Sequence, residues 1–415
     1  MGALNDWREV RLEDVCERIT VGHVGSMANE YVSEGIPFLR SQNITPFKVD
    51  LRDVKYITSE FNEKLKKSAL RPGDVAVVRT GYPGTAAVIP RALMVSNCSD
   101  LVIIRPGEEI DSWFLSCLFN SVWGKNMVAG NLVGVAQQHF NVGAAKNLRI
   151  RLPPIQIQQT IASILRNYDD LIENNTRRIE ILEEMARRLY EEWFVQFRFP
   201  GHEGVEFKES ELGLIPEGWK VVALETAVEI NPKTKVERDG EKVFVPMGAL
   251  SETGMVISGW EIKSGNSGAK FQNGDTLVAR ISPCLENGKT GFVDFLPANQ
   301  PTACGSTEFI VLRSRSLCPE MVYCLSRSDR FREVAMKSMS GATGRQRVRV
   351  ESLLGYPIAQ PENELVAKYH AFAQPCFKEI RVLANKNANL RQQRDLLLPK
   401  LISGEIDVSD IPMPT

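Results

Sequence analysis

An apolar pattern that occurs twice in the chain constrains its fold more than any other feature. From Ile161 to Trp193, apolar residues recur in alternating steps of four and three, and a similar pattern returns 208 positions later, from Tyr369 to Leu401. This spacing predicts two helices, each about 50 Å long. Such helices exceed the width of a small domain, so they bury their apolar seams most simply against each other. The alternative is that each helix packs only on its own neighbouring domain.

Polar residues at seam positions indicate how the two helices pair. Asn175 interrupts the first seam, and Asn387 and Arg394 interrupt the second. If the helices pair antiparallel about their centres, Asn175 and Asn387 face each other. A buried amide at a seam position disfavours slipped alignments, so this pair helps to define the register. Pro375 is expected to kink the first turns of the second helix.

The segments before the two helices also repeat. "WREVRLEDV" at Trp7 matches "WKVVALETA" at Trp219, and the Gly-Asp turns of "RPGDVAVVR" and "QNGDTLVAR" each lead into a short strand that ends in arginine. A second strand follows ("SDLVIIR", "TEFIVLR"), then the start of a helix ("FLSCL", "MVYCL"). These matches predict an α+β protein with two mixed α/β domains in pseudo-twofold arrangement, joined by an antiparallel two-helix coiled coil. The predicted boundaries are 1–152 (first domain), 153–197 (first long helix), 198–218 (a Gly-, Pro- and charge-rich linker), 219–360 (second domain), 361–405 (second long helix) and 406–415 (tail).

Composition narrows the class of protein. The chain has 415 residues, is 43% hydrophobic and 24% charged, and has a net charge of −1, which is typical of a soluble globular protein with two to four domains. It contains no apolar run that could span a membrane. The eight cysteines form no CxxC pair and the four histidines are scattered, so we expect a reduced, cytoplasmic protein without a metal site.

The common motifs of catalysis and cofactor binding are absent or incomplete in this sequence. "ENGKT" at Glu286 ends like a phosphate-binding loop, but Pro283 stands where that loop needs glycine. "NPKT" at Asn231 lacks the aromatic residue of the amino-methyltransferase motif, and HExxH, GxSxG and GxGxxG are absent. The sequence therefore predicts a non-catalytic chain that binds no cofactor. A catalytic pair assembled from distant residues is the alternative.

The doubled layout resembles the DNA specificity subunits of Type I restriction-modification systems. The stretches that carry the resemblance include "GIPFLRSQNI", "LPPIQIQQTIASIL", "RRLYEEWFVQFRFPG", "RISPCLENGKTGF" and "LRQQRDLLLPKLISGEI", and together they cover nearly the whole chain. The resemblance implies two target-recognition domains that read a bipartite sequence in double-stranded DNA, one half-site each. It also implies two modification subunits that methylate adenine N6 and further restriction subunits as partners, with S-adenosylmethionine, ATP and Mg²⁺ bound by those partners.

Residues that occur in only one of the two domains are the better candidates for reading bases, because shared features cannot specify two different half-sites. Arginine can read guanine, and asparagine or glutamine can read adenine, through paired hydrogen bonds. The base-reading candidates are Arg40, Ser41, Gln42, Asn43, Tyr82, Ser282, Glu286, Asn287 and Lys289. The alternatives are a buried turn for Asn43, simple packing for Tyr82 and an ordinary turn for "ENGK".

Shared or locally basic residues are candidates for contacts to the DNA backbone. Residues 112–152 contain four basic residues and no acidic one, and 327–349 contain seven basic residues against two acidic ones. The backbone candidates are Arg79, Lys125, Gln138, Lys146, Arg280, Arg345, Gln346 and Arg347. Arg79 and Arg280 end matching strands and are equally compatible with a role in the fold. Two other functions remain open: a coiled-coil interaction adaptor without a DNA role, and a nuclease or methyltransferase with degenerate motifs.

Overall fold

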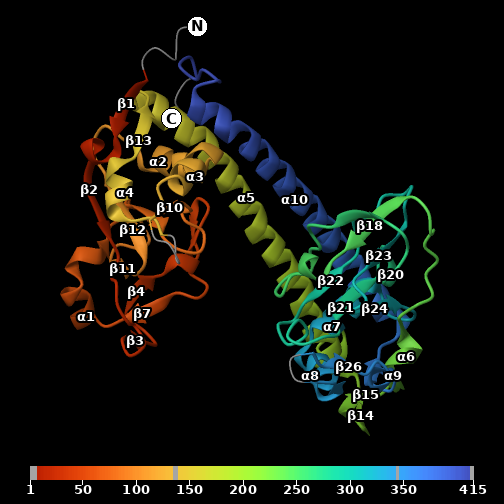
Figure 1. Ribbon diagram of the computed structural model, residues 1–415. Helices are drawn as coiled ribbons and strands as arrows, with labels where there is room; N and C mark the ends of the chain where they lie inside the picture. Colours follow the sequence, from red (N-terminus) through yellow and green to blue (C-terminus); the bar gives the residue numbers. More distant parts are fainter. Residues whose placement is uncertain (1–6, 134–138, 343–344, 412–415) are drawn as a thin grey trace. The chain divides into compact units, whose positions relative to one another are not determined.

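The computed structural model describes residues 7–133, 139–342 and 345–411 (Figure 1). It consists of two compact units. The first comprises residues up to Glu173 together with those from Asn389 onward, and the second comprises Asn174–Ala388. Each unit therefore holds one mixed α/β domain and part of both long helices.

The described part of the first domain is built around a four-stranded sheet and a five-stranded sheet, with two further strand pairs and four short α-helices. One sheet has the strand order β10-β9-β12-β2, and the other has the order β3-β7-β4-β11-β8. The strands are β1 (Arg8–Arg11), β2 (Cys16–Val21), β3 (Tyr31–Val32), β4 (Ile36–Leu39), β5 (Ile44–Thr45), β6 (Lys48–Val49), β7 (Lys55–Ile57), β8 (Ala69–Leu70), β9 (Val75–Val78), β10 (Ala86–Val88), β11 (Ser96–Cys98), β12 (Leu101–Pro106) and β13 (Arg149–Leu152). The helices are α1 (Ser59–Lys64), α2 (Ser112–Asn120), α3 (Val122–Ala129) and α4 (Val142–Asn147).

The second domain uses the same kinds of element. Its sheets have the orders β22-β21-β24-β17 and β19-β18-β23-β20. The strands from Lys220 onward are β16 (Lys220–Ala223), β17 (Val228–Ile230), β18 (Glu241–Val245), β19 (Glu261–Ser264), β20 (Ala269–Gln272), β21 (Thr276–Ala279), β22 (Thr290–Phe292), β23 (Thr302–Gly305), β24 (Phe309–Ser314), β25 (Met339–Ser340), β26 (Arg347–Val348) and β27 (Pro357–Gln360). The helices are α6 (Leu224–Ala227), α7 (Pro319–Arg327), α8 (Asp329–Lys337) and α9 (Glu351–Leu354).

The two domains share the main features of their topology, as the repeat predicted, and the first domain has β3 as an additional edge strand. In each, the first sheet is antiparallel throughout, and the second contains a single parallel pair, β4 with β11 in the first domain and β18 with β23 in the second. An antiparallel pair, β1 with β13 or β16 with β27, brings the two ends of each domain together. The predicted Gly-Asp turns lead into β9 and β21, and the predicted helix starts are α2 and α7. The α+β fold class is therefore confirmed, and the twofold relation between the domains stays a prediction.

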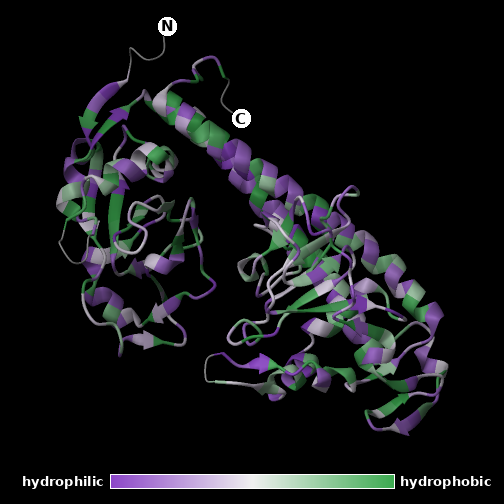
Figure 2. Ribbon diagram, turned by 45° about the vertical axis from the view of Figure 1, so that its right-hand side comes forward, coloured by the Kyte–Doolittle hydropathy of each residue, from purple (hydrophilic) through white to green (hydrophobic). Residues whose placement is uncertain are grey.

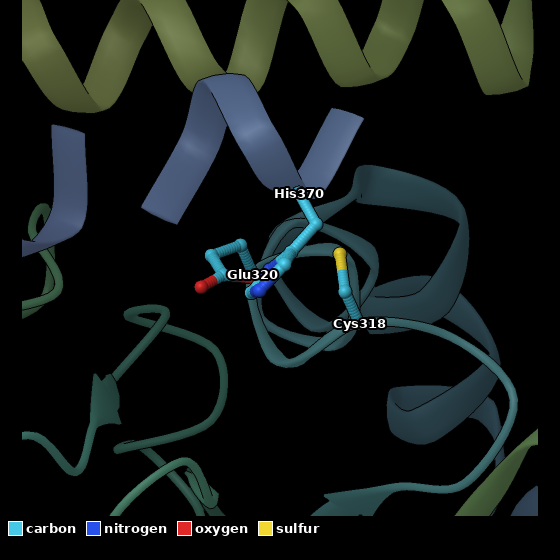
Figure 3. Close-up of side chains that lie close together, drawn as sticks. All are labelled: Cys318, Glu320 and His370. Atoms are coloured by element: carbon cyan, nitrogen blue, oxygen red, sulfur yellow. The ribbon is translucent and has the colours of Figure 1, made fainter. Parts of the chain in front are cut away.

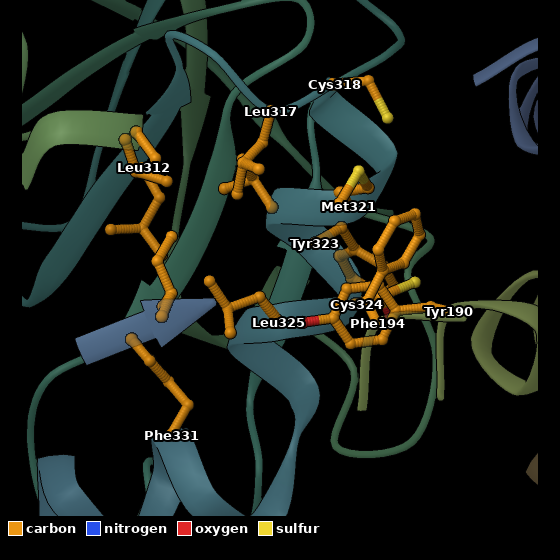
Figure 4. Close-up of a cluster of buried hydrophobic side chains, with 14 of the residues drawn as sticks. Tyr190, Phe194, Leu312, Leu317, Cys318, Met321, Tyr323, Cys324, Leu325 and Phe331 are labelled. Carbon is orange, nitrogen blue, oxygen red and sulfur yellow. The ribbon is translucent and has the colours of Figure 1, made fainter. Parts of the chain in front are cut away.

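Each domain packs its apolar residues against its own part of the long helices, α5 (Ile155–Tyr190) and α10 (Asn363–Ser403). In the first unit, Ile161 and Leu165 of α5 and Leu401 of α10 join the buried core formed by β9, β12 and α2. In the second unit, Tyr190 and Phe194 lie with the side chains of α7 in the core (Figure 4). Hydrophilic and hydrophobic residues alternate along both helices (Figure 2), which matches helices that bury one face.

The helices also contact each other, and within each unit they run antiparallel. In the second unit, Asn175 donates from Nδ2 to Oδ1 of Asn387 at 2.9 Å, and the hydroxyl of Tyr369 donates to the backbone carbonyl of Ala186 at 3.0 Å. In the first unit, Arg394 pairs with Asp169 at 2.5 Å. The predicted contact between the two asparagines is confirmed. All twenty predicted seam positions are buried or half-buried, so the helices pack both on the domains and on each other.

Two parts of the chain differ from the sequence-based expectation. Pro375 does not interrupt α10, because Ala373, Cys376 and Phe377 are buried on both sides of it and hold the helix against the core. Residues 198–218, predicted as a linker, contain an antiparallel hairpin of β14 (Phe207–Ser210) and β15 (Gly213–Pro216). Trp219, just after this hairpin, stacks with Phe199 at a ring-centroid distance of 5.6 Å, which anchors the segment.

None of the helices in the described part of the chain has the length and hydropathy that crossing a membrane requires.

Candidate nucleic-acid interface

A buried ion pair occupies the same position in both domains. In the first domain, Arg105 of β12 donates to both carboxylate oxygens of Asp74 at 2.8 Å. In the second, Arg313 of β24 donates to both oxygens of Asp275 at 2.7 Å. The two aspartates are the last residues of the Gly-Asp turns and are almost fully buried. Burial raises the pKa of Asp275, and the hydrogen bonds from Arg313 act in the opposite direction. These pairs stabilise a common framework and cannot distinguish two half-sites.

Arg79 and Arg280, the shared arginines, belong to that framework as well. Arg79 donates from Nε to the carbonyl of Phe140 at 3.3 Å, and Arg280 donates from Nη2 to the carbonyl of Val348 at 3.2 Å. The backbone carbonyl of each arginine also accepts a hydrogen bond from the amide of the same partner, Phe140 or Val348. Of the two alternatives, a role in the fold matches this geometry better than a phosphate contact, since each guanidinium ties the end of a strand to a later loop.

Of the glutamines in the matching loops, Gln346 lies in the described part of the chain and Gln138 lies outside it. The carbonyl of Gln346 accepts a hydrogen bond from the amide of Ser282 at 3.0 Å. Gln346 is half-buried. Its backbone therefore holds the loop that carries the candidates of the second domain.

The candidates from Arg40 to Asn43 form a 3-10 turn, Ser41–Asn43, which the second domain repeats as Met247–Ala249 with different side chains. Arg40 and Gln42 both donate to the carboxylate of Asp53, at 2.9 and 2.6 Å. The Ser41 hydroxyl donates to the carbonyl of Asp100 at 3.2 Å. Asn43 is buried: it accepts from the amide of Arg40 and donates to the carbonyl of Asp50. The buried-turn alternative thus fits Asn43. Arg40 and Gln42 would have to break their hydrogen bonds to Asp53 before they could bind a base.

Tyr82 is the most exposed large hydrophobic residue in the described part of the first domain. Its side chain is 83% exposed, in a loop that follows β9 and that turns at Gly81 and Gly84, both with positive φ. The packing alternative does not fit this exposure. An exposed aromatic ring on a tight loop can stack on bases or enter a groove.

The second-domain candidates lie on a compact helical turn between β21 and β22. Ser282 donates to Glu286 at 2.7 Å, and Asn287 donates to Glu252 at 3.2 Å. Glu286 and Asn287 are exposed, and Lys289 is half-buried. The turn is ordered by its own hydrogen bonds, in line with the ordinary-turn alternative, and it still presents polar groups to solvent.

The predicted backbone cations fall into two groups. Lys146 is paired with Glu13 at 2.6 Å, and Arg347 with Glu308 at 2.7 Å. The hydrogen bonds from Arg347 hold the pKa of Glu308 below its ordinary value. Lys125 and Arg345 are exposed and have no carboxylate partner among the residues that the structure describes. The second group can offer full charges to phosphates, whereas the first group is already neutralised.

Sequence reasoning missed a basic cavity in the second domain. It has a volume of about 550 Å³ and is bordered by the end of β17, by β20, β21 and β24. Its lining includes Lys233, Lys270 and Arg280 and no carboxylate. Neither lysine has an ion-pair partner in the described part of the chain. The "NPKT" stretch holds Lys233, but only the fold brings Lys270 beside it.

Similarity to known proteins extends over nearly the whole chain. The family model of the Type I restriction modification DNA specificity domain matches residues 5–184. The chain is 25% identical to the Type I restriction enzyme MjaIX specificity subunit of Methanocaldococcus jannaschii, over 98% of this chain and 95% of that protein. It is 23% identical to the HindI specificity subunit of Haemophilus influenzae, over 97% of this chain and 100% of that protein.

Along its whole length the chain is similar to Type I restriction-modification specificity subunits, and residues 5–184 match the DNA specificity domain of that family. Residues 5–184 therefore form a DNA specificity domain, and the similarity of the whole chain to specificity subunits supports the prediction of a non-catalytic chain. A crystal structure of the Type I S subunit from M. genitalium has the same fold, with a TM-score of 0.59 at 13% identity over 95% of this chain and 96% of that one. The resemblance found in the sequence is thereby confirmed.

Proposed function

We propose that this specificity subunit reads a bipartite target in double-stranded DNA, with one half-site for each domain. The observation that carries the proposal is the repeated framework with different loops on it. The buried ion pairs, the strand-ending arginines and the 3-10 turns recur, but the side chains on those turns do not. A common framework with unlike surface groups is what two different half-sites require.

Backbone contacts supply affinity without sequence preference, and the basic cavity of the second domain suits this role. Lys233 and Lys270 are the unpaired cations that line it, and phosphate oxygens are the ligands that such cations bind in DNA. In the first domain, the exposed Lys125 of α3 is assigned to the same role. Base reading is assigned to Arg40, Gln42 and Tyr82 in the first domain and to the Ser282–Lys289 turn in the second.

The partners follow from the family. We propose that the subunit holds two modification subunits, which methylate adenine N6 with S-adenosylmethionine, and that restriction subunits use ATP and Mg²⁺ when they join. The specificity subunit itself then needs no cofactor.

Footprinting at physiological salt tests the proposal against the adaptor function. The subunit, assembled with its modification subunits, should protect two short segments separated by an unprotected or weakly protected spacer. Uniform absence of protection would favour an interaction adaptor. Turnover by the purified chain alone, with Mg²⁺ or S-adenosylmethionine, would instead indicate an enzyme.

A further inference from the structure

Three side chains with metal-binding groups converge in the second unit (Figure 3). Cys318 immediately precedes α7, Glu320 is in its first turn, and His370 lies on α10. One donor atom from each lies within 4.8 Å of the other two. Cys318 and Glu320 are buried, at 7% and 3% exposure, and His370 is half-buried.

We propose that Cys318, Glu320 and His370 bind one divalent transition-metal ion of the zinc class. Thiolate, imidazole and carboxylate are the three side-chain groups that bind Zn²⁺ in proteins, and three protein ligands leave one tetrahedral position for water. The half-exposed ring of His370 gives that position access to solvent. The mixture of sulfur, nitrogen and oxygen disfavours Mg²⁺ and Ca²⁺, which prefer oxygen ligands alone.

The present geometry is close to that of a metal site but slightly compressed. Nδ1 of His370 lies 2.8 Å from an oxygen of Glu320, which is a hydrogen-bond distance. Ligand distances of about 2.0–2.2 Å and tetrahedral angles would set this separation at about 3.3 Å. Side-chain rotation at the half-exposed histidine is sufficient for that change. Without a metal, the side chains of Glu320 and His370 form a hydrogen-bonded pair.

The duplicated framework does not explain the cluster. The residue of the first domain that matches Cys318 is Asp111, which caps α2 by accepting from the amide of Phe114 at 2.8 Å. Aspartate is a preferred capping residue and cysteine is not. The position that matches His370 holds Ala162. The second domain thus replaces a good cap and an alanine by two metal-binding residues, and the proposal is independent of DNA recognition.

A bound ion would link α10 to α7 within the second unit. Because metal binding requires the folded arrangement, it stabilises that arrangement by mass action. The sequence-based expectation of no metal site rested on the wide spacing of the histidines, and this proposal replaces it.

Metal analysis of the full chain tests the proposal. The chain, purified under reducing conditions without chelators, is dialysed against Zn²⁺ and then against metal-free buffer, and its metal content is measured by mass spectrometry. We expect about one equivalent of zinc per chain, with a lower melting temperature after chelation. Exchange with Co²⁺ should produce a near-ultraviolet thiolate-to-cobalt charge-transfer band.

Substitutions locate the site. Cys318→Ala and His370→Ala should each lose the bound zinc and the charge-transfer band. The control is Cys376→Ala, which removes a buried thiol on α10 outside the cluster and should retain both the zinc and the band. Zinc retained by both site variants, or a wild-type chain that binds no zinc and shows no cobalt band, would overturn the proposal. The cobalt spectrum of the wild-type chain decides the matter even if a variant fails to fold.

Discussion

At the residue scale, the aspartate of each Gly-Asp turn forms a buried ion pair with an arginine of a neighbouring strand. Asp275 is 1% exposed, and its partner Arg313 has a side chain that is 21% exposed. The Gly-Asp turn that holds Asp275 and the strand that holds Arg313 were both predictable from local sequence. The ion pair was not, because it depends on the pairing of β21 with β24, which are distant in the chain.

Replacing Asp275 should strongly destabilise the second domain. Asp275→Ala leaves Arg313 partly buried without its carboxylate, which costs about 3–5 kcal/mol. The free energy of unfolding in urea measures the loss. Asp14→Ala, which removes an exposed pair with Arg11, is the control and should change stability little. Equal effects of the two substitutions would show that burial of the pair is unimportant.

The cations of the basic cavity should act on every DNA sequence alike. Lys270→Ala should weaken binding to specific and non-specific duplexes by a similar factor and reduce the slope of log K against log salt by about one. Fluorescence anisotropy at several salt concentrations gives both quantities. Lys235→Ala, outside the cavity lining, is the matched control. A loss confined to one DNA sequence would assign Lys270 to base reading instead.

At the element scale, the paired helices were the most predictable part of the molecule. A long apolar heptad pattern specifies a helix and its buried face without knowledge of tertiary contacts. The polar seam position Asn175 was equally informative, since it meets Asn387 as predicted, whereas the pairing of Arg394 with Asp169 was not predicted. The hairpin of 207–216 was missed because its Gly-, Pro- and charge-rich composition is also typical of linkers.

A double-mutant cycle tests the role of the asparagine pair. Asn175→Leu should lower the free energy of unfolding by about 1–2 kcal/mol, because Asn387 is 3% exposed and loses a donor. Adding Asn387→Leu should recover much of that loss, since two apolar residues replace a buried polar pair. Strictly additive effects of the two substitutions would mean that the amides do not stabilise each other.

At the scale of the whole molecule, duplication was visible in the sequence, and the order of the four strands in the first sheet of each domain agrees with it. What sequence could not supply was the state of each polar candidate. The side chain of Asn43 forms hydrogen bonds within its own turn, and the charge of Arg347 is neutralised by Glu308. Lys270 lines the cavity because the fold places β20 beside the other lining segments. These assignments depend on contacts between segments far apart in the chain, which local pattern does not encode.

The central claim is that each domain reads its own half-site. The most direct test maps N6-methyladenine across host DNA after co-expression with the modification subunit, for the wild-type chain and for Arg40→Ala and Lys289→Ala. We expect a bipartite motif for the wild type, a relaxed preference in one half for Arg40→Ala, and a relaxed preference in the other half for Lys289→Ala. A single continuous motif, or relaxation of the same half by both substitutions, would contradict the account.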